Sequence, residues 1–120
     1  MKTGFTAHEL SQFTATEHWH RHAINRKVFF TDGVKYVAER AEAYWLIDEV
    51  ALTQHYVMRV AAQEFQVWNL QVNADSSAQL VCEDGNHNAL YTKTIPFTDF
   101  PGEGIILWFT NNTILLPSEY

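Results

Sequence analysis

Three of the six histidines of this 120-residue chain stand at alternate positions, as His18, His20 and His22. In an extended segment their side chains share one face, and three imidazoles with an open fourth position form a known catalytic zinc arrangement. In a helix only His18 and His22 would share a face. A motif without a fourth ligand carries a high false-positive risk, so we favour a polar connector that Trp19 anchors to the core, without a cofactor. Zinc or another first-row metal is the runner-up.

Two neighbouring carboxylates, Asp48 and Glu49, interrupt the most apolar helical stretch of the sequence. A carboxylate in apolar surroundings has a raised pKa and can serve as a general acid or base. With Tyr44 or His22, Asp48 could line a pocket between helices and sheet. The surrounding apolar residues can fill the core without the two acids, so we favour a solvent-facing position for both. No serine or cysteine forms a recognisable nucleophile motif with a histidine, so no catalytic residue is assigned.

The net formal charge of −6 lies entirely in the second half of the chain. Residues 1–59 carry seven bases and seven acids, whereas residues 60–120 carry seven acids and a single base, Lys93. Such a surface attracts basic proteins and repels phosphate backbones, although solubility alone also explains it. The acids gather in expected turns and at strand ends, and five of them form the candidate partner-binding rim: Asp75, Glu83, Asp84, Asp99 and Glu103.

The first part of the chain, which carries the three alternating histidines and the Asp48–Glu49 pair, is expected to be mainly helical. Residues 6–9 form a capping box for a short first helix. Three apolar side chains would dock that helix: Phe5, Leu10 and Phe13. After the histidine-rich connector, residues 28–31 form a short strand or a buried segment.

A longer helical region follows. Asp32 is a suitable N-cap, and apolar residues recur at helical spacing up to Trp45. Residues 44–56 are apolar nearly all round, which indicates a more deeply buried helix. No glycine or proline marks a break near Ala43. One long helix and two helices separated by a kink therefore remain open alternatives.

After Arg59 the pattern changes to short runs of β-branched and aromatic residues separated by turn chemistry. Asn111-Asn112 suits a two-residue hairpin because asparagine tolerates a positive φ. The expected strands cover residues 65–72, 78–83, 89–97, 105–110 and 113–116. We therefore predict a single α+β domain over residues 1–120, with N-terminal helices packed on a four- to five-stranded antiparallel meander sheet.

The strand at residues 105–109 is apolar on both faces, so one face packs on the helices and the other needs a cover. Two covers are open: loop residues 97–100, or a second copy in a homodimer. Strong basic side chains are absent beside Trp68, Tyr91 and Trp108, apart from Lys93, which argues against direct nucleic-acid binding.

The single cysteine, Cys82, excludes an internal disulfide and reads as a small buried hydrophobe in an alternating strand. An intracellular setting is favoured, because disulfides belong to oxidising compartments. No apolar run indicates a signal peptide or a membrane span. We therefore expect a cytoplasmic protein without membrane contact.

Four segments of the chain form a recognisable series: FTDGVKY at 30–36, AYWLID at 43–48, EFQVW at 64–68 and LPSEY at 116–120. The chain resembles a family of small bacterial proteins of unknown function, encountered on plasmids, on phage-related elements and in cyanobacterial genomes. The resemblance implies a single-domain accessory of mobile elements, and it supplies no catalytic or binding residues. His22 fits the family pattern better than His18 or His20, which lowers the metal hypothesis further.

The leading hypothesis is a non-enzymatic protein-interaction module whose acidic loops engage a basic protein partner. Its concrete version is a mobile-element inhibitor of a host nuclease or defence complex, of the anti-CRISPR or anti-restriction type. The alternative is a small metal-dependent or ligand-binding enzyme that uses the three histidines or a helix–sheet pocket.

Overall fold

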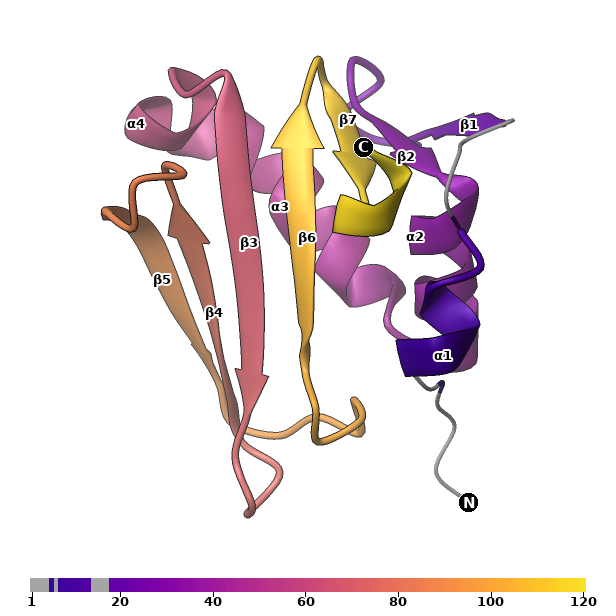
Figure 1. Cartoon of the computed structure of the whole chain (residues 1–120). Coiled ribbons are helices and arrows are strands. Elements are labelled where there is room, and N and C mark those ends of the chain that lie inside the picture. The colour runs from indigo at the N-terminus through magenta and orange to yellow at the C-terminus, as the bar shows by residue number, and fades with distance from the viewer. Residues whose placement is uncertain (1–4, 6, 14–17) are drawn as a thin grey trace.

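The structure is a computed structural model that describes residues 5, 7–13 and 18–120. The first half holds helices and two short strands, and strands dominate the second half (Figure 1). The elements are α1 (Ala7–Leu10), β1 (Trp19–Arg21), β2 (Phe29–Thr31), α2 (Asp32–Arg40), α3 (Tyr44–Tyr56), α4 (Met58–Ala61), β3 (Phe65–Val72), β4 (Ala78–Glu83), β5 (Ala89–Ile95), β6 (Ile105–Thr110), β7 (Thr113–Leu115) and the 3-10 helix η1 (Pro117–Glu119).

The strands of the described residues form one seven-stranded sheet with the order β1-β2-β7-β6-β3-β4-β5. Its pairs are antiparallel except β2 and β7, which run parallel. The α+β class is confirmed, but the four- to five-stranded antiparallel meander is wrong. The sheet is larger because β1 and β2, which precede α2, add to it. It is not a meander because β6 pairs with β3 and not with β5, the strand before it in the sequence.

Burial explains why β3 is central and β5 lies at an edge. Alternate residues of β3 are fully buried, including Trp68 and Leu70 at 0% and 1% exposure. β5 has the exposed run Thr92, Lys93 and Thr94, and exposed polar residues suit an edge strand. The apolar β6 therefore takes the second neighbouring position beside β3, where more of its surface is covered.

The helices α2 and α3 follow one another along the covered face of the sheet, with α3 passing behind it in Figure 1. The break between them settles the open question of one helix or two. Glu42 adopts a left-handed φ of 53°, which ends the helical path without a glycine or proline. The expected N-cap is wrong by one residue: Thr31 caps α2 by accepting a hydrogen bond from Val34 N, and Asp32 begins the helix.

The strand bounds follow the sequence pattern closely. β3, β4 and β6 have the predicted limits, and β5 and β7 end two residues and one residue early. Asn111 and Asn112 have φ of 52° and 58°, which confirms the two-residue hairpin. Thr6 of the expected capping box lies outside the described residues, whereas Phe5, Leu10 and Phe13 pack against the core as predicted.

A buried carboxylate latches the C-terminus to the start of α2. Glu119 is 8% exposed and accepts hydrogen bonds from Thr31 Oγ1 at 2.6 Å, Leu116 N at 2.9 Å and Gly33 N at 3.1 Å. A Cβ at Gly33 would lie 2.7 Å from Glu119 Oε1, so only glycine fits at this close approach. The latch places Tyr120 on the opposite face of the sheet from the helices.

Candidate functional site

The three alternating histidines lie next to two different carboxylates, Asp32 and Asp48. His20 Nε2 lies 2.9 Å from Asp32 Oδ1, and His18 Nδ1 lies 3.4 Å from Asp32 Oδ2. The hydrogen bond from His20 lowers the pKa of the Asp32 carboxyl. Across residues 5, 7–13 and 18–120, no group of three or more His, Cys, Asp or Glu side chains is placed to hold a metal ion.

His22 is the structural anchor of the connector. It is 4% exposed, and its Nε2 lies 2.7 Å from Asp48 Oδ1. Its Nδ1 accepts hydrogen bonds from Ile24 N and Asn25 N, so the proton resides on Nε2, which donates to Asp48. Trp19 is 58% exposed, so its expected anchoring role is wrong and His22 supplies the anchor instead.

The carboxylates of α3 are engaged with other elements. Glu49, expected to face solvent, accepts hydrogen bonds from Tyr91 OH and Lys93 Nζ, each at 2.8 Å, and so ties α3 to β5. Half-exposed Asp48 holds His22. Tyr44 is 44% exposed at the start of α3, where partial burial and then Glu39 raise its pKa. The two pockets described below are lined by neither Tyr44 nor Asp48.

The five acids of the expected rim lie at two ends of the sheet. Asp75 in the β3–β4 turn lies at the same end as Asp99 and Glu103 in the β5–β6 connection, and Thr98 N donates to Ser76 O to join these loops (Figure 1). Glu83 and Asp84 lie at the other end, where β4 meets β5.

The two turn aspartates also hold their own turns. Asp75 accepts hydrogen bonds from Ser77, and Asp84 accepts them from Asn86 and Asn88. These bonds lower the pKa of both carboxyls. Their first role is therefore local, and any partner would meet acids that are already fixed in position.

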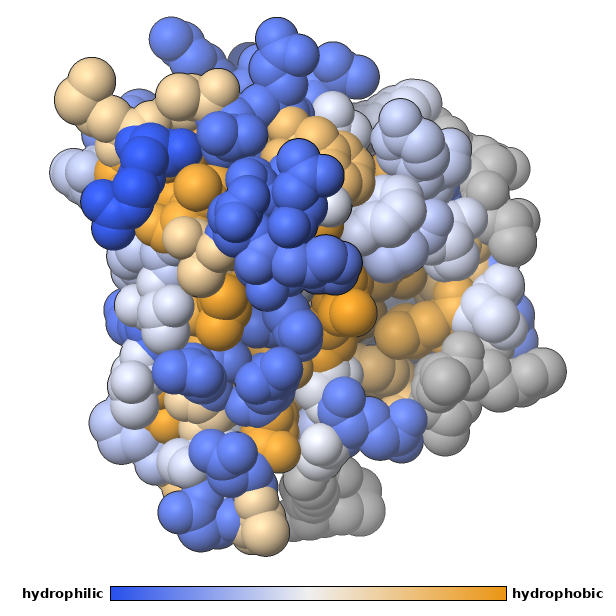
Figure 2. All heavy atoms as spheres, turned by 60° about the vertical axis from the view of Figure 1, so that its left-hand side comes forward, coloured by the Kyte–Doolittle hydropathy of each residue, from blue (hydrophilic) through white to orange (hydrophobic). Residues whose placement is uncertain are grey.

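The sheet face opposite the helices, here called the open face, carries apolar side chains. The register places Val67 beside Trp108 on one flank and Glu83 on the other, so these side chains share a face. Five apolar strand residues on this face are half-exposed or exposed: Phe65, Val67, Val81, Ile106 and Trp108. In Figure 2, which brings the left-hand side of Figure 1 forward, hydrophobic surface appears in patches between hydrophilic side chains.

The C-terminus supplies the partial cover of the open face. The Tyr120 ring lies 5.4 Å from that of Trp108 and 6.5 Å from that of Phe65, both edge-on. The cover expected from residues 97–100 does not lie over Trp108: Phe100 is buried against Phe5, and Phe97 is 65% exposed. Ile106 remains 45% exposed.

A hollow of about 510 Å³ continues the open face beyond Ile106. Its lining comes from α1, the connection before β6 and the segment around η1. Apolar side chains such as Phe5, Ile106 and Leu116 line it, and Glu103 stands among them. The hollow can accept an apolar side chain next to a cation.

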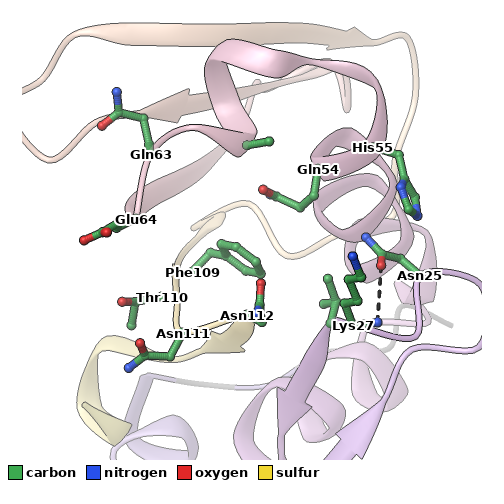
Figure 3. A pocket seen from close by; sticks show the side chains of 12 residues that line it. Asn25, Lys27, Gln54, His55, Gln63, Glu64, Phe109, Thr110, Asn111 and Asn112 are labelled. Atoms are coloured by element: carbon green, nitrogen blue, oxygen red, sulfur yellow. Dashed lines mark hydrogen bonds between the residues drawn. The ribbon is translucent and has the colours of Figure 1, made fainter.

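A second pocket, of about 490 Å³, opens at the end of α3 (Figure 3). Loop residues 25–28, the end of α3, the α4–β3 connection and the β6–β7 hairpin form its walls. Its polar lining is mostly carboxamide, with one lysine and one glutamate. The named groups are Asn25, Lys27, Gln54, His55, Gln63, Glu64, Thr110, Asn111 and Asn112.

Behind this pocket lies a buried amide network that the sequence did not reveal. Gln66 is 0% exposed and exchanges two hydrogen bonds with Gln54, at 2.8 and 2.9 Å. It also donates to Val60 O and accepts from Trp68 Nε1. No local motif signals such a network, because its members come from α3, α4 and β3 and meet only in the folded chain.

A family model for the family of unknown function DUF6876 matches residues 4–120 of the chain. The chain therefore belongs to this family, which agrees with the resemblance of its four segments. No curated protein and no solved structure matches the chain significantly. None of the described helices combines the length and hydrophobicity needed to cross a bilayer.

Proposed function

We propose that this member of the DUF6876 family is a protein-interaction module that binds a basic partner through the open face of its sheet. The observation that carries the proposal is a half-exposed apolar face that four acids border. This proposal replaces the acidic rim of the sequence hypothesis with one surface that has an apolar centre. It keeps the basic partner.

The apolar centre supplies the affinity. Aromatic and aliphatic side chains at the centre of an interface contribute most of its binding free energy when a partner excludes water from them. Trp108 and Ile106 lie on the same strand, and the hollow beside Ile106 offers space for an anchoring side chain. Tyr120 is 79% exposed, so a partner can contact its ring as well.

The charges select the partner. Four acids border the open face in sequence or register: Glu64, Glu83, Asp84 and Glu103. Lys93, the single base of residues 60–120, binds Glu49 on α3, and the adjoining Arg59 donates to Leu90 O, so both are engaged away from the open face. An acidic border favours encounter with a basic surface and raises the association rate at low salt.

A second copy of the chain is a poor occupant, because it would bring the same acids against those already present. We expect the purified protein to be a monomer at micromolar concentration, which light scattering measures. The basic nucleic-acid groove of a nuclease or defence complex has the required chemistry. That class of partner remains the concrete version of the proposal.

The test compares two isoleucines that are both exposed. Ile106→Lys places a base in the acidic border and removes an apolar contact, whereas Ile24→Lys makes the same change at a 67% exposed position in the connector. Immobilised wild type and both variants are exposed to host lysate at two salt concentrations, and captured proteins are identified by mass spectrometry.

We expect Ile106→Lys to lose a basic partner that wild type and Ile24→Lys retain, and higher salt to weaken capture. A partner that Ile106→Lys retains at wild-type level would exclude the open face. A partner insensitive to salt would exclude charge selection.

A further inference from the structure

We propose that the pocket at the end of α3 binds a short peptide with both termini free. This site lies at the end of the helix layer; it shares the border acid Glu64 with the open face, but its lining does not include the open-face residues Phe65, Val67, Val81, Ile106 or Trp108. The inference therefore goes beyond the proposed partner binding and stands or falls separately.

Two walls of the pocket are already fixed by hydrogen bonds. Asn25 is 4% exposed, donates from Nδ2 to Ala51 O at 2.8 Å and accepts from Lys27 N. Its own backbone N–H is held by His22, which Asp48 holds in turn. Gln54, on α3, is locked to Gln66 and Val50 O. Such walls keep their shape before a ligand arrives, which lowers the entropic cost of binding.

Four other polar side chains of the pocket have no hydrogen-bond or ion-pair partner among the described residues. Lys27, Glu64 and Gln63 make no side-chain hydrogen bond or ion pair with another described residue, and the same holds for Asn112. The pocket carries one formal base and one formal acid, so it is formally neutral in a chain of net charge −6. A neutral pocket with both signs favours a ligand that itself carries both signs.

The arrangement of these groups indicates the ligand. Figure 3 shows Lys27 and Glu64 on opposite sides of the pocket, with Asn112 between them. A short peptide has an ammonium at one end, a carboxylate at the other and amides between. Carboxamides both donate and accept, so Gln63 and Asn112 match a peptide bond. A free amino acid has both charges on one carbon and does not match charges on opposite walls.

The experiment is calorimetric titration of the full chain with triglycine, its N-acetyl form and its C-terminal amide. Each cap removes one terminal charge, and we expect each to weaken binding about tenfold, equivalent to about 1.4 kcal/mol. Glucose and glycine serve as a hydroxyl-rich ligand and a single amino acid. We expect both to bind more weakly than triglycine.

Variants assign the two ends. Lys27→Met should abolish the preference for a free carboxylate and Glu64→Gln the preference for a free ammonium. Lys35→Met and Glu42→Gln make the same changes outside the pocket and should bind as wild type. Ile106→Lys should also bind triglycine normally, which separates this site from the open face.

Absence of triglycine binding at millimolar concentrations would overturn the proposal. So would capped forms that bind as tightly as triglycine itself, or tighter binding of glucose or glycine. Lys27 and Glu64 are exposed, so loss of the fold is not expected in their variants. A circular dichroism spectrum equal to that of wild type confirms this before each titration.

Discussion

The difference between the two faces of the sheet is clearest along β3, because this strand places alternate side chains on each face. Its covered face buries a glutamine, Gln66, at 0% exposure, while its open face presents Phe65 and Val67 half-exposed. The covered face thus tolerates a polar residue because every hydrogen-bonding group of that residue has a partner. Among the described residues, no buried side-chain nitrogen or oxygen lacks a hydrogen bond.

This difference indicates that the covered face provides stability and that the open face is available for binding. The covered face contains the large fully buried side chains, including Trp68, Leu80 and Leu107, so substitutions there should lower the free energy of unfolding strongly. The open face gains less from folding because its apolar side chains stay partly in water. Apolar residues that folding does not require point to an interface. The following experiments test that separation, from the largest effect to the smallest.

Thiol reactivity should distinguish the faces by several orders of magnitude. Burial, followed by Glu83 and Asp84, raises the pKa of Cys82 to about 12. At pH 8 roughly 10⁻⁴ of such a thiol is thiolate, against roughly a quarter of a free cysteine. Ellman's reagent should therefore leave folded wild type unmodified. Val81→Cys, in a Cys82→Ala background, moves the thiol by one residue to the open face. Its thiol should react with Ellman's reagent at the rate of a solvent-accessible cysteine.

Guanidinium chloride provides the control, since both thiols must react once the chain unfolds. Raising the pH should accelerate modification of native Cys82, because the thiolate fraction grows toward its pKa. Fast modification of wild type at pH 8 would show that the covered face opens readily.

The buried amide network should contribute the largest change in stability. Gln66→Ala leaves Trp68 Nε1 and the Gln54 amide without their partner, removes one of the donors to Val60 O and creates a cavity, so we expect a loss of about 4 kcal/mol in the free energy of unfolding. Gln71→Ala is the matched control, because Gln71 is exposed on the same strand. Urea denaturation measures both. A loss below about 1 kcal/mol in Gln66→Ala would mean that water replaces the side chain at little cost.

The sequence predicts the strands of the second half well because their signals are local. Alternation over residues 65–72 and the turn residues around it act within a few positions, and so does the Asn111-Asn112 hairpin. Which strands pair with one another, in contrast, depends on how much apolar surface the assembled sheet buries, and no local pattern shows this. β6 pairs with β3 across the β5–β6 connection, and β2 pairs in parallel with β7, which lies far away in the sequence.

The candidate sites show the same limit. Histidine spacing predicts which imidazoles share a strand face, but Asp32 and Asp48, which bind them, come from two helices. The pocket at the end of α3 draws its lining from separate segments, none of which carries a motif. The open face, in contrast, follows from a local pattern, because residues 105–109 are apolar on both strand faces.

The C-terminal latch, formed by Glu119 and the start of α2, connects the two faces of the sheet. Its disruption should lower the free energy of unfolding by less than Gln66→Ala and by more than Ile106→Lys. Gly33→Ala would place a Cβ 2.7 Å from Glu119 Oε1 and from a Leu116 methyl carbon, so η1 must move. Alanine favours helices over glycine by roughly 1 kcal/mol, but the clash should exceed this and give a net loss of about 2 kcal/mol. Release of Tyr120 should also uncover Trp108 and increase binding of a hydrophobic dye.

Gly102→Ala is the matched control, because a Cβ there meets nothing within 4 Å. Its stability and dye binding should equal those of wild type. Stabilisation by Gly33→Ala would show that helix propensity outweighs the contact and that the latch is loose.

The smallest change in stability is expected at the position that matters most for partner binding. Ile106 is 45% exposed, and Ile106→Lys loses some strand propensity but leaves no buried cavity, so the expected loss is about 1 kcal/mol or less. Its neighbour Leu107 is 1% exposed on the covered face, and Leu107→Ala should lose about 3 kcal/mol. Urea midpoints of the two variants measure the contrast between adjacent residues of one strand. Equal losses would mean that the open face is a structural surface, and the loss of partner by Ile106→Lys would then reflect unfolding instead of a removed contact.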